Sequence, residues 1–250
     1  MKLFLDSAKV DEIRYALDQW DVDGVTTNPR HVQTSGRPFR DVLEGIAALV
    51  AGTDKPVSVE VNPHLTDPTE IVREGRMLAE MSPNFVVKVG VSEPGCRAMR
   101  ELAGDGIRVN ATLIFSTAQA WHAARAGAAY VSPFLGWKEQ YGDAADELVR
   151  DVRLMLDRHG YDTQIIAAAM RNSYQLGAVA IAGAHCATGG VDMYRDSFRH
   201  PYTTMGEGIF TRAWDATPAT VQGEPSSDGA GRDGAHVGDG AHRAGMVAVL

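Results

Sequence analysis

The sequence of 250 residues is poor in cysteine and lacks long apolar runs. Its two cysteines, Cys96 and Cys186, are too few and too far apart in sequence to suggest a metal site or a disulfide framework, so we expect free thiols in a reducing compartment. No stretch of about eighteen apolar residues occurs, which excludes a membrane-spanning helix. The first residues turn charged after Leu5 and so lack the apolar region of a signal peptide. We therefore expect a cytoplasmic protein that does not associate with membranes.

Basic residues are outnumbered by acidic ones, and the formal net charge is -8. A general nucleic-acid-binding protein needs a basic face for the phosphates, so this charge balance argues against nucleic acid as a partner. Small anions remain possible ligands at a local cluster of basic side chains. Lysine is especially scarce, because only Lys2, Lys9, Lys55, Lys88 and Lys138 occur among the basic residues.

The sequence also lacks a glycine-rich dinucleotide fingerprint after its first apolar run, which disfavours an open doubly wound sheet. Short apolar runs instead alternate with helical-period segments over about the first 200 residues, a pattern typical of repeated βα units. Eight such units predict an α/β fold, a (β/α)8 TIM barrel, and a chain of this length can form it as one domain. The eight predicted strands are Leu3–Leu5, Val22–Thr26, Val57–Val61, Phe85–Val89, Ile107–Leu113, Tyr130–Pro133, Gln164–Ala168 and Ala184–Thr188.

The end of the sequence departs from this alternation. Residues Tyr202–Asp215 have the apolar spacing of one extra C-terminal helix, which we expect to pack on the barrel or on a neighbouring subunit. From Pro218 onward the composition shifts to Gly, Ala, Ser, Asp and His, which predicts a disordered tail. We therefore predict a barrel domain with its C-terminal helix over residues 1–217 and a tail over residues 218–250.

Nearly every apolar run ends in, or is followed by, one or two polar residues. In a (β/α)8 barrel the carboxyl ends of the strands meet at one face, and that face carries the chemistry. Polar residues at these ends therefore predict an active site. The residues concerned are Asp6, Asn28, Glu60, Lys88, Asn110 with Thr112, Ser132 and Arg171.

Lys88, in PNFVVKVG, is the most informative of them. A lysine inside a sheet is costly as an ammonium ion unless it is paired or its pKa is depressed. Arginine cannot replace it as an amine nucleophile, because a guanidinium group is never usefully deprotonated. We interpret Lys88 as a nucleophile that captures a carbonyl group; the alternative is a strand-end lysine that extends to solvent.

Two carboxylates belong to the same predicted face. Asp6 in LFLDSA and Glu60 in VSVEVNP are suited to moving protons to and from hydroxyl groups during C–C cleavage. Each has an alternative interpretation as the ion-pair partner of a buried base. Thr27 and Asn28 in DGVTTNP are candidate substrate-binding residues, although Asn-Pro by itself is mainly a turn signal.

Taken together, LFLDSA, DGVTTNP, SVEV, NFVVKVG, VNATLIFSTAQA, YVSPFLGW and AAAMRN resemble, in this order and spacing, the transaldolase and fructose-6-phosphate aldolase family. The resemblance spans about residues 1–215. It implies a TIM barrel, no cofactor, no metal, and a covalent imine on Lys88. The positions that match the family's active site are Asp6, Asn28, Glu60, Asn110 and Thr112. By the same resemblance Glu60 and a water held by Thr112 carry protons during imine formation, and Asp6 deprotonates the C4 hydroxyl as the C3–C4 bond breaks.

Two motifs depart from the family pattern. The family reads SPFVGR and ASFRN where this sequence has SPFLGW and AAMRN, so Trp137 and Ala169 replace an arginine and a serine that help to hold the sugar phosphate. Arg171 remains, and Arg30 and His31 in NPRH are further additions that can supply compensating donors. A dianionic phosphate favours several charge-assisted donors, whereas a monoanionic sulfonate needs fewer. We therefore expect Arg30, Arg171 and Lys138 to bind the anionic end of the substrate.

The same motifs, with SGRPF and VDMYRDSFRH, resemble a branch of the family that acts on 6-deoxy-6-sulfofructose. This resemblance implies transfer of a dihydroxyacetone unit to glyceraldehyde 3-phosphate, with release of sulfolactaldehyde, in sulfoquinovose breakdown. An ordinary transaldolase or fructose-6-phosphate aldolase is the first alternative. A barrel that binds sugar phosphates without catalysis is the second. We expect small sugar sulfonates and phosphates as the substrates and a homo-oligomer as the assembly.

Overall fold

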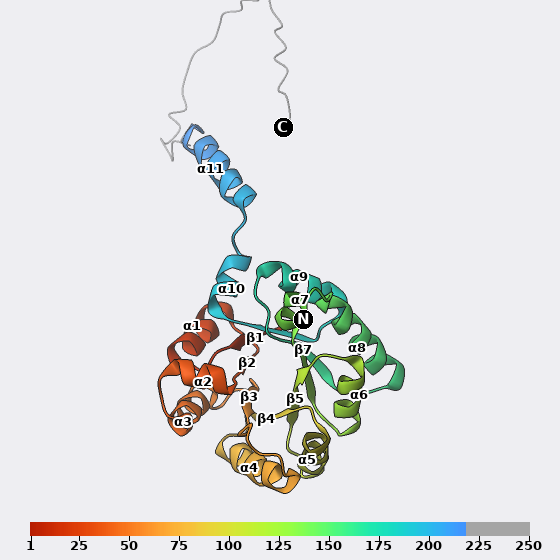
Figure 1. The fold of residues 1–250 in the computed structure, drawn as a ribbon. Coiled ribbons are helices and arrows are strands. Elements are labelled where there is room, and N and C mark those ends of the chain that lie inside the picture. The colour runs from red at the N-terminus through yellow and green to blue at the C-terminus, as the bar shows by residue number, and fades with distance from the viewer. Residues whose placement is uncertain (219–250) are drawn as a thin grey trace, which may run out of the picture. The chain divides into compact units, whose positions relative to one another are not determined.

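The computed structural model describes residues 1–218, and its centre is a closed barrel of eight parallel strands (Figure 1). The strands follow one another around the barrel in sequence order, and β1 pairs with β8 to close it. The predicted TIM barrel is therefore confirmed. The strands are β1 Lys2–Asp6, β2 Gly24–Thr26, β3 Val57–Glu60, β4 Phe85–Gly90, β5 Val109–Ile114, β6 Tyr130–Pro133, β7 Gln164–Ala167 and β8 Cys186–Gly189.

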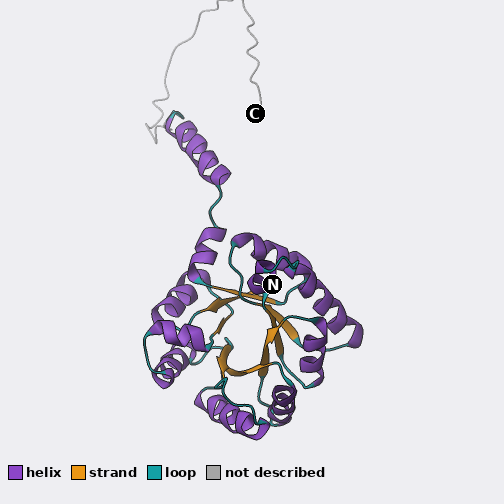
Figure 2. Cartoon of the chain, viewed as in Figure 1, coloured by secondary structure: helices purple, strands orange, loops and turns teal. Residues whose placement is uncertain are grey.

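Helices surround the strands and return the chain from the end of one strand to the start of the next (Figure 2). Each parallel pair needs such a crossover, since a short turn cannot join two parallel strands. The helices of the barrel are α1 Val10–Trp20, α2 Pro29–Ser35, α3 Phe39–Val50, α4 Pro68–Met81, α5 Glu93–Gly104, α6 Thr117–Arg125, α7 Leu135–Gln140, α8 Ala145–His159, α9 Ser173–Ala182 and α10 Val191–Ser197. Among residues 1–218, none of the helices has the length and apolarity that crossing a membrane requires.

All eight predicted strands are present, and three of them begin later than the apolar runs suggest: β5 begins at Val109 instead of Ile107, and β2 and β8 also begin two residues late. The run Val22–Thr26 becomes a strand only at Gly24, because the preceding Asp23 uses its side chain to accept a hydrogen bond from the backbone of Leu3, at 2.8 Å. The run Ala184–Thr188 begins at Cys186, since the ring of His185 accepts from the backbone of Ile165, at 2.9 Å.

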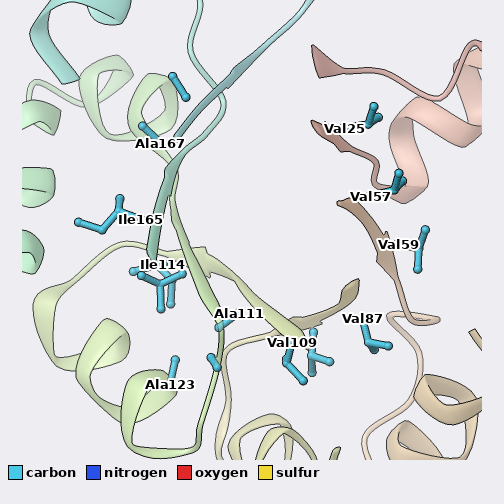
Figure 3. Packing of buried hydrophobic residues seen from close by; sticks show 14 of the residues in the cluster. Val25, Val57, Val59, Val87, Val109, Ala111, Ile114, Ala123, Ile165 and Ala167 are labelled. Atoms are coloured by element: carbon cyan, nitrogen blue, oxygen red, sulfur yellow. The ribbon is translucent and has the colours of Figure 1, made fainter. Parts of the chain in front are cut away.

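The main core lies between the barrel wall and the helices. Figure 3 shows Val25, Val57 and Val59 on one side of the barrel and Ile165 on the other, pointing away from its axis. Side chains alternate along a strand, so the neighbouring positions face the barrel interior. A small second cluster of Phe4, Ile166 and Cys186, with Tyr130 packed against it, is buried separately from the main core. The alternation that buries these valines is the same one that turns polar side chains toward the axis.

The predicted C-terminal helix is confirmed as α11 Pro201–Asp215. The chain divides into two structural units, Met1–Thr204 and a second that begins at Met205. The packing of α11 on the barrel or on another subunit stays a prediction. The predicted tail, residues 218–250, lies outside the described residues apart from Pro218, and the domain boundary at 217 also stays a prediction.

Candidate active site

The carboxyl ends of the strands open into one cavity of about 590 Å³. Most of the residues predicted for the site lie along this cavity, although their positions in the sequence are far apart. The cavity is lined by the predicted residues Asp6, Asn28, Arg30, Lys88, Ser132, Trp137, Ala169 and Arg171, by His31, which the sequence indicated only as an additional donor, and by Thr26 and Thr188, which were not predicted.

Lys88 projects from the middle of β4 into the barrel. Its side chain is only 5 % exposed. Its Nζ donates to the backbone oxygen of Thr27 at 2.9 Å and lies 3.2 Å from Oε2 of Glu60. The strand register explains the pairing, because Glu60 of β3 stands directly opposite Lys88. A buried amine that faces one carboxylate and one carbonyl can exchange protons locally, which a nucleophilic amine requires.

Asp6 ends β1 and is held by two neighbouring elements. Thr26 of β2 donates to its Oδ1 at 2.8 Å, and Nε2 of His31 in α2 lies 3.1 Å from its Oδ2. Burial acts to raise the pKa of the Asp6 carboxyl group, but the hydrogen bond and charge of His31, together with Lys88 and Thr26, hold that pKa below its usual range. Asp6 is therefore a carboxylate with fixed orientation and low proton affinity.

Thr112 occupies an irregular part of β5. The following residue, Leu113, has a positive φ of 60°, and the register with β6 shifts between Ala111 and Ile114. Such a bulge re-aims the side chains next to it. Thr112 is 1 % exposed, and its Oγ1 is the one buried side-chain polar atom without a hydrogen-bond partner within residues 1–218. A hydroxyl left unpaired in this way is suited to hold a water or a substrate atom.

Two predicted residues lie deeper than expected. Asn110 is fully buried and does not line the cavity; its amide donates to Ser58 at 3.0 Å and accepts from Ser132 at 2.8 Å. The hydroxyl of Thr27 donates to the backbone of Ser58, so only its carbonyl group faces Lys88. Both side chains form part of a polar layer beneath the cavity.

Asn28 both caps a helix and lines the cavity. Its Oδ1 caps α2 by accepting from the backbone of His31 at 3.0 Å, while the residue also lines the cavity. Capping leaves the amide N–H groups of Asn28 available for a substrate hydroxyl. The same cap fixes the start of α2, which carries Arg30 and His31.

The cavity mouth carries the residues that depart from the family pattern. Trp137 is 47 % exposed and stacks on Phe115 with ring centroids 5.9 Å apart. Ala169 has a positive φ of 56°, an uncommon conformation for a residue other than glycine. Arg171 is exposed and lines the cavity. Lys138 instead pairs with Asp143 at 2.8 Å and is not among the cavity-lining residues, so the expectation that it binds the anion is not supported by its position.

A buried glutamine that the sequence did not reveal supports Arg171. Gln175 accepts from the backbone N–H of Arg171 and donates to the carboxylate of Glu139 in α7. Nη2 of Arg171 also donates to Gln140 of the same helix, at 3.2 Å. These contacts join α7, which carries Trp137, to the segment between β7 and α9.

Among residues 1–218, no group of three His, Cys, Asp or Glu side chains is arranged to hold a metal ion. The cavity is instead lined by the Lys88 amine, the Asp6 carboxylate and the basic residues Arg30 and Arg171. Glu60, which pairs with Lys88, and the unpaired hydroxyl of Thr112 are not among the cavity-lining residues.

Comparisons with known proteins show the family of this chain. The family described as Transaldolase/Fructose-6-phosphate aldolase matches residues 3–222. Proteins named 6-deoxy-6-sulfo-D-fructose transaldolase, from Priestia aryabhattai and Priestia megaterium, are 48% identical over 218 residues, covering 87% of this chain and 96% of theirs. A probable transaldolase from Hydrogenobaculum sp. is 43% identical over 87% of this chain and 98% of its own. A thiamine phosphate pyrophosphorylase from Pyrococcus furiosus shares the fold alone, with a TM-score of 0.56 and 15% identity over 78% of this chain and 91% of its own.

Proposed function

Because this chain belongs to the transaldolase/fructose-6-phosphate aldolase family and is a transaldolase, we propose that Lys88 forms an imine with the C2 carbonyl of a ketose. The observation that carries this proposal is the buried Nζ of Lys88, held between Thr27 and Glu60 at the base of the cavity. The amine forms the bond to C2, and the carbonyl oxygen leaves as water.

Protons move through the groups around Lys88. Glu60, 3.2 Å from the amine, takes up and returns protons as the carbinolamine forms and loses water. The unpaired hydroxyl of Thr112 holds the water that takes part in this exchange. Asp6 then takes the proton of the C4 hydroxyl, the C3–C4 bond breaks, and its electron pair stays on C3 in conjugation with the iminium group. An aldehyde leaves, and the three-carbon unit remains on Lys88 for transfer to an acceptor aldehyde.

The donor that we propose is 6-deoxy-6-sulfofructose. Glyceraldehyde 3-phosphate, or erythrose 4-phosphate, accepts the dihydroxyacetone unit, and sulfolactaldehyde is released in sulfoquinovose degradation. Two considerations support this donor. Relatives at 48% identity carry the name of this activity. In addition, Trp137 and Ala169 stand where the family has two groups that hold a phosphate, which leaves a mouth better matched to a monoanionic sulfonate.

One anion site must serve both the sulfonate of the donor and the phosphate of the acceptor. Arg30 and Arg171 are the residues that we assign to it, because both line the cavity mouth. Ser132 and Asn28 line the same cavity, and we assign them to the hydroxyl groups of the sugar. No cofactor takes part in the reaction as proposed.

An ordinary transaldolase or fructose-6-phosphate aldolase is the alternative that shares this chemistry. It predicts phosphate donors only and assigns no purpose to Trp137. A non-catalytic sugar-phosphate-binding barrel is a second alternative. It offers no reason for a buried amine beside a carboxylate, and membership of this enzyme family weighs against it.

The experiment that tests the proposed donor uses the purified chain with 6-deoxy-6-sulfofructose or fructose 6-phosphate, each with and without an acceptor aldehyde. Mass spectrometry follows the aldehydes released. We expect sulfolactaldehyde to accumulate only when glyceraldehyde 3-phosphate or erythrose 4-phosphate is present. If the chain turned over fructose 6-phosphate without an acceptor and did not turn over 6-deoxy-6-sulfofructose, the result would favour the aldolase alternative.

Trp137→Arg tests the assignment of the cavity mouth. The new guanidinium restores the donor present in the family, and a dianion gains more from it than a monoanion. We expect the ratio of kcat/KM for fructose 6-phosphate to that for 6-deoxy-6-sulfofructose to rise about tenfold, as one charge-assisted hydrogen bond provides. Tyr141→Arg adds the same charge at a site that is 85 % exposed, and this control variant should leave the ratio unchanged. If both substitutions changed this ratio equally, Trp137 would not determine the preference between the two donors.

A cytoplasmic location and a homo-oligomeric state stay predictions of the sequence. Sedimentation of the full chain measures the second directly.

A further inference from the structure

The side chain of His31 reaches from α2 to the Asp6 carboxylate at the end of β1. It lies in α2, its Nε2 is 3.1 Å from Oδ2 of Asp6, and its side chain is 29 % exposed. The family resemblance assigned it no role in catalysis, and from the sequence it was only a further donor near Arg30. Its imidazole ring instead contacts the carboxylate that moves the substrate proton.

Residues of two elements, β2 and α2, fix the Asp6 carboxylate in one orientation. Oδ1 accepts from Thr26, which stands opposite Asp6 in the β1–β2 register and lies 2.7 Å from the hydroxyl of Thr188. Oδ2 faces His31, whose backbone N–H is fixed by the Asn28 cap. Each carboxylate oxygen keeps a second lone pair, so Asp6 remains able to accept a proton from substrate.

We propose that His31 is a positioning residue for Asp6, which orients the carboxylate and favours return of its proton to the acceptor aldehyde. This inference rests on the proposed transaldolase reaction. In the donor half-reaction Asp6 gains the C4 hydroxyl proton while the C3–C4 electron pair stays on C3. In the acceptor half-reaction that pair forms the new bond to the aldehyde carbon, and the aldehyde oxygen takes the proton from Asp6. Both steps balance without any further reagent.

The charge of His31 affects these half-reactions in opposite directions. A carboxylic acid that binds its proton weakly is a poorer base but a better acid. The low pKa of Asp6, to which His31 contributes, therefore assists the acceptor half-reaction and keeps Asp6 ionised as the pH falls. Other charged or titratable groups face this pair from the surrounding elements and act on it together with His31. They are Lys9 before α1, Asp11 and Glu12 of α1, Arg30 of α2, Lys88 of β4, Arg171 after β7, and Asp192, Tyr194 and Arg195 of α10.

His31→Gln separates the charge of the ring from its hydrogen bond, because the glutamine amide can donate to Asp6 but cannot be protonated. His31→Leu removes both. His122→Gln is the matched control, since His122 is exposed on α6 and lines no part of the cavity. Circular dichroism establishes that each variant is folded before it is compared.

The first measurement is the titration of Asp6 in the free enzyme by 13C-carboxylate NMR, with the signal assigned through Asp6→Asn. We expect Asp6 to titrate at higher pH in His31→Gln than in the wild type or in His122→Gln. The second is single-turnover kinetics of the two half-reactions. We expect His31→Gln to slow the acceptor half-reaction and not the donor half-reaction, and His31→Leu to slow both because the carboxylate loses its orientation.

An unchanged Asp6 titration would overturn the proposal. Equal slowing of both half-reactions by His31→Gln would also overturn it, because His31 would then not favour the return of the proton. A loss confined to KM would overturn it too, because His31 would then only bind substrate. If the wild type forms no covalent adduct with any ketose, the proposed reaction fails instead. The NMR titration still reports on the His31–Asp6 pair in that case, so the two failures are distinguishable.

Discussion

Arg171 has an exposed guanidinium group, while its backbone N–H group is held by a hydrogen bond. Gln175 fixes its N–H group, and Gln140 accepts from its Nη2. A cation held in this way loses little freedom when it binds an anion, and this lowers the cost of binding. The buried amide of Gln175 thus supports the proposed anion site through Arg171.

Arg171→Ala should raise the KM for anionic donors and acceptors with little change in kcat. The interaction with the anion exists in the ground state as well as in the transition state, and its loss costs about 1 to 3 kcal/mol. Arg40→Ala is the control, because Arg40 lies on the surface of α3 and pairs with Glu44. Steady-state kinetics with both sugars decides; an unchanged KM would place the anion elsewhere.

At the scale of elements, α7 packs closely against the segment after β7. An ideal Cβ on Gly136 would lie 2.5 Å from the backbone oxygen of Ala169 and 2.8 Å from two side-chain atoms of Arg171. Only glycine allows this approach, since real Cβ atoms do not come so close to other atoms. The helix that carries Trp137 and the segment that carries Arg171 are therefore in direct contact at Gly136.

Gly136→Ala should force α7 away from Arg171. We expect a loss of about 1 to 3 kcal/mol in the free energy of unfolding, as for other overpacked positions, and a higher KM for anionic sugars. Gly177→Ala in α9 is the matched control, because a Cβ there meets nothing within 4 Å. That control should stabilise the protein by about 0.5 to 1 kcal/mol. Denaturant melts and KM values test both; if Gly136→Ala retains both properties, the close packing does not position Arg171.

Elements also show what the sequence could and could not predict. The eight strands were predictable because each is an apolar run followed by a helical segment, and the site was predictable because parallel strands end at one face. The depth of Asn110 was not predictable, since it depends on the partners Ser58 and Ser132 that barrel closure brings to it. The pairing of His31 with Asp6 depends in the same way on α2, a helix too short to show periodicity in the sequence.

At the scale of the whole molecule, the end of the barrel opposite the cavity contains a hydrogen bond that requires an uncharged histidine ring. Nδ1 of His185 accepts from the backbone of Ile165 next to the β7–β8 pair, and Arg153 lies 3.3 Å from its Nε2. Burial, and then the positive charge of Arg153, lower the pKa of His185. A ring that accepts through Nδ1 must be unprotonated there, so protonation breaks this contact.

The lowered pKa of His185 predicts how stability depends on pH. Below the unfolded-state pKa of histidine, about 6.5, the unfolded chain binds a proton that the folded chain resists. The contribution is thus fully present above that pH and is lost as the pH falls toward the folded-state pKa. Urea melts between pH 7 and pH 5 should show a falling free energy of unfolding, with a smaller slope in His185→Asn. His159→Asn, an exposed control, should keep the wild-type slope. Equal slopes in the wild type and His185→Asn would contradict the prediction.

The central claim, an imine on Lys88, is tested most directly by borohydride reduction of the full chain with 6-deoxy-6-sulfofructose and, separately, fructose 6-phosphate. Peptide mass spectrometry then locates the adduct. We predict a reduced dihydroxyacetone adduct on Lys88 in the wild type and in Lys55→Met, whose lysine pairs with Asp21, and none in Lys88→Met. An adduct on a different lysine, an adduct that persists in Lys88→Met, or no adduct with either sugar would contradict the assignment of Lys88 as the nucleophile.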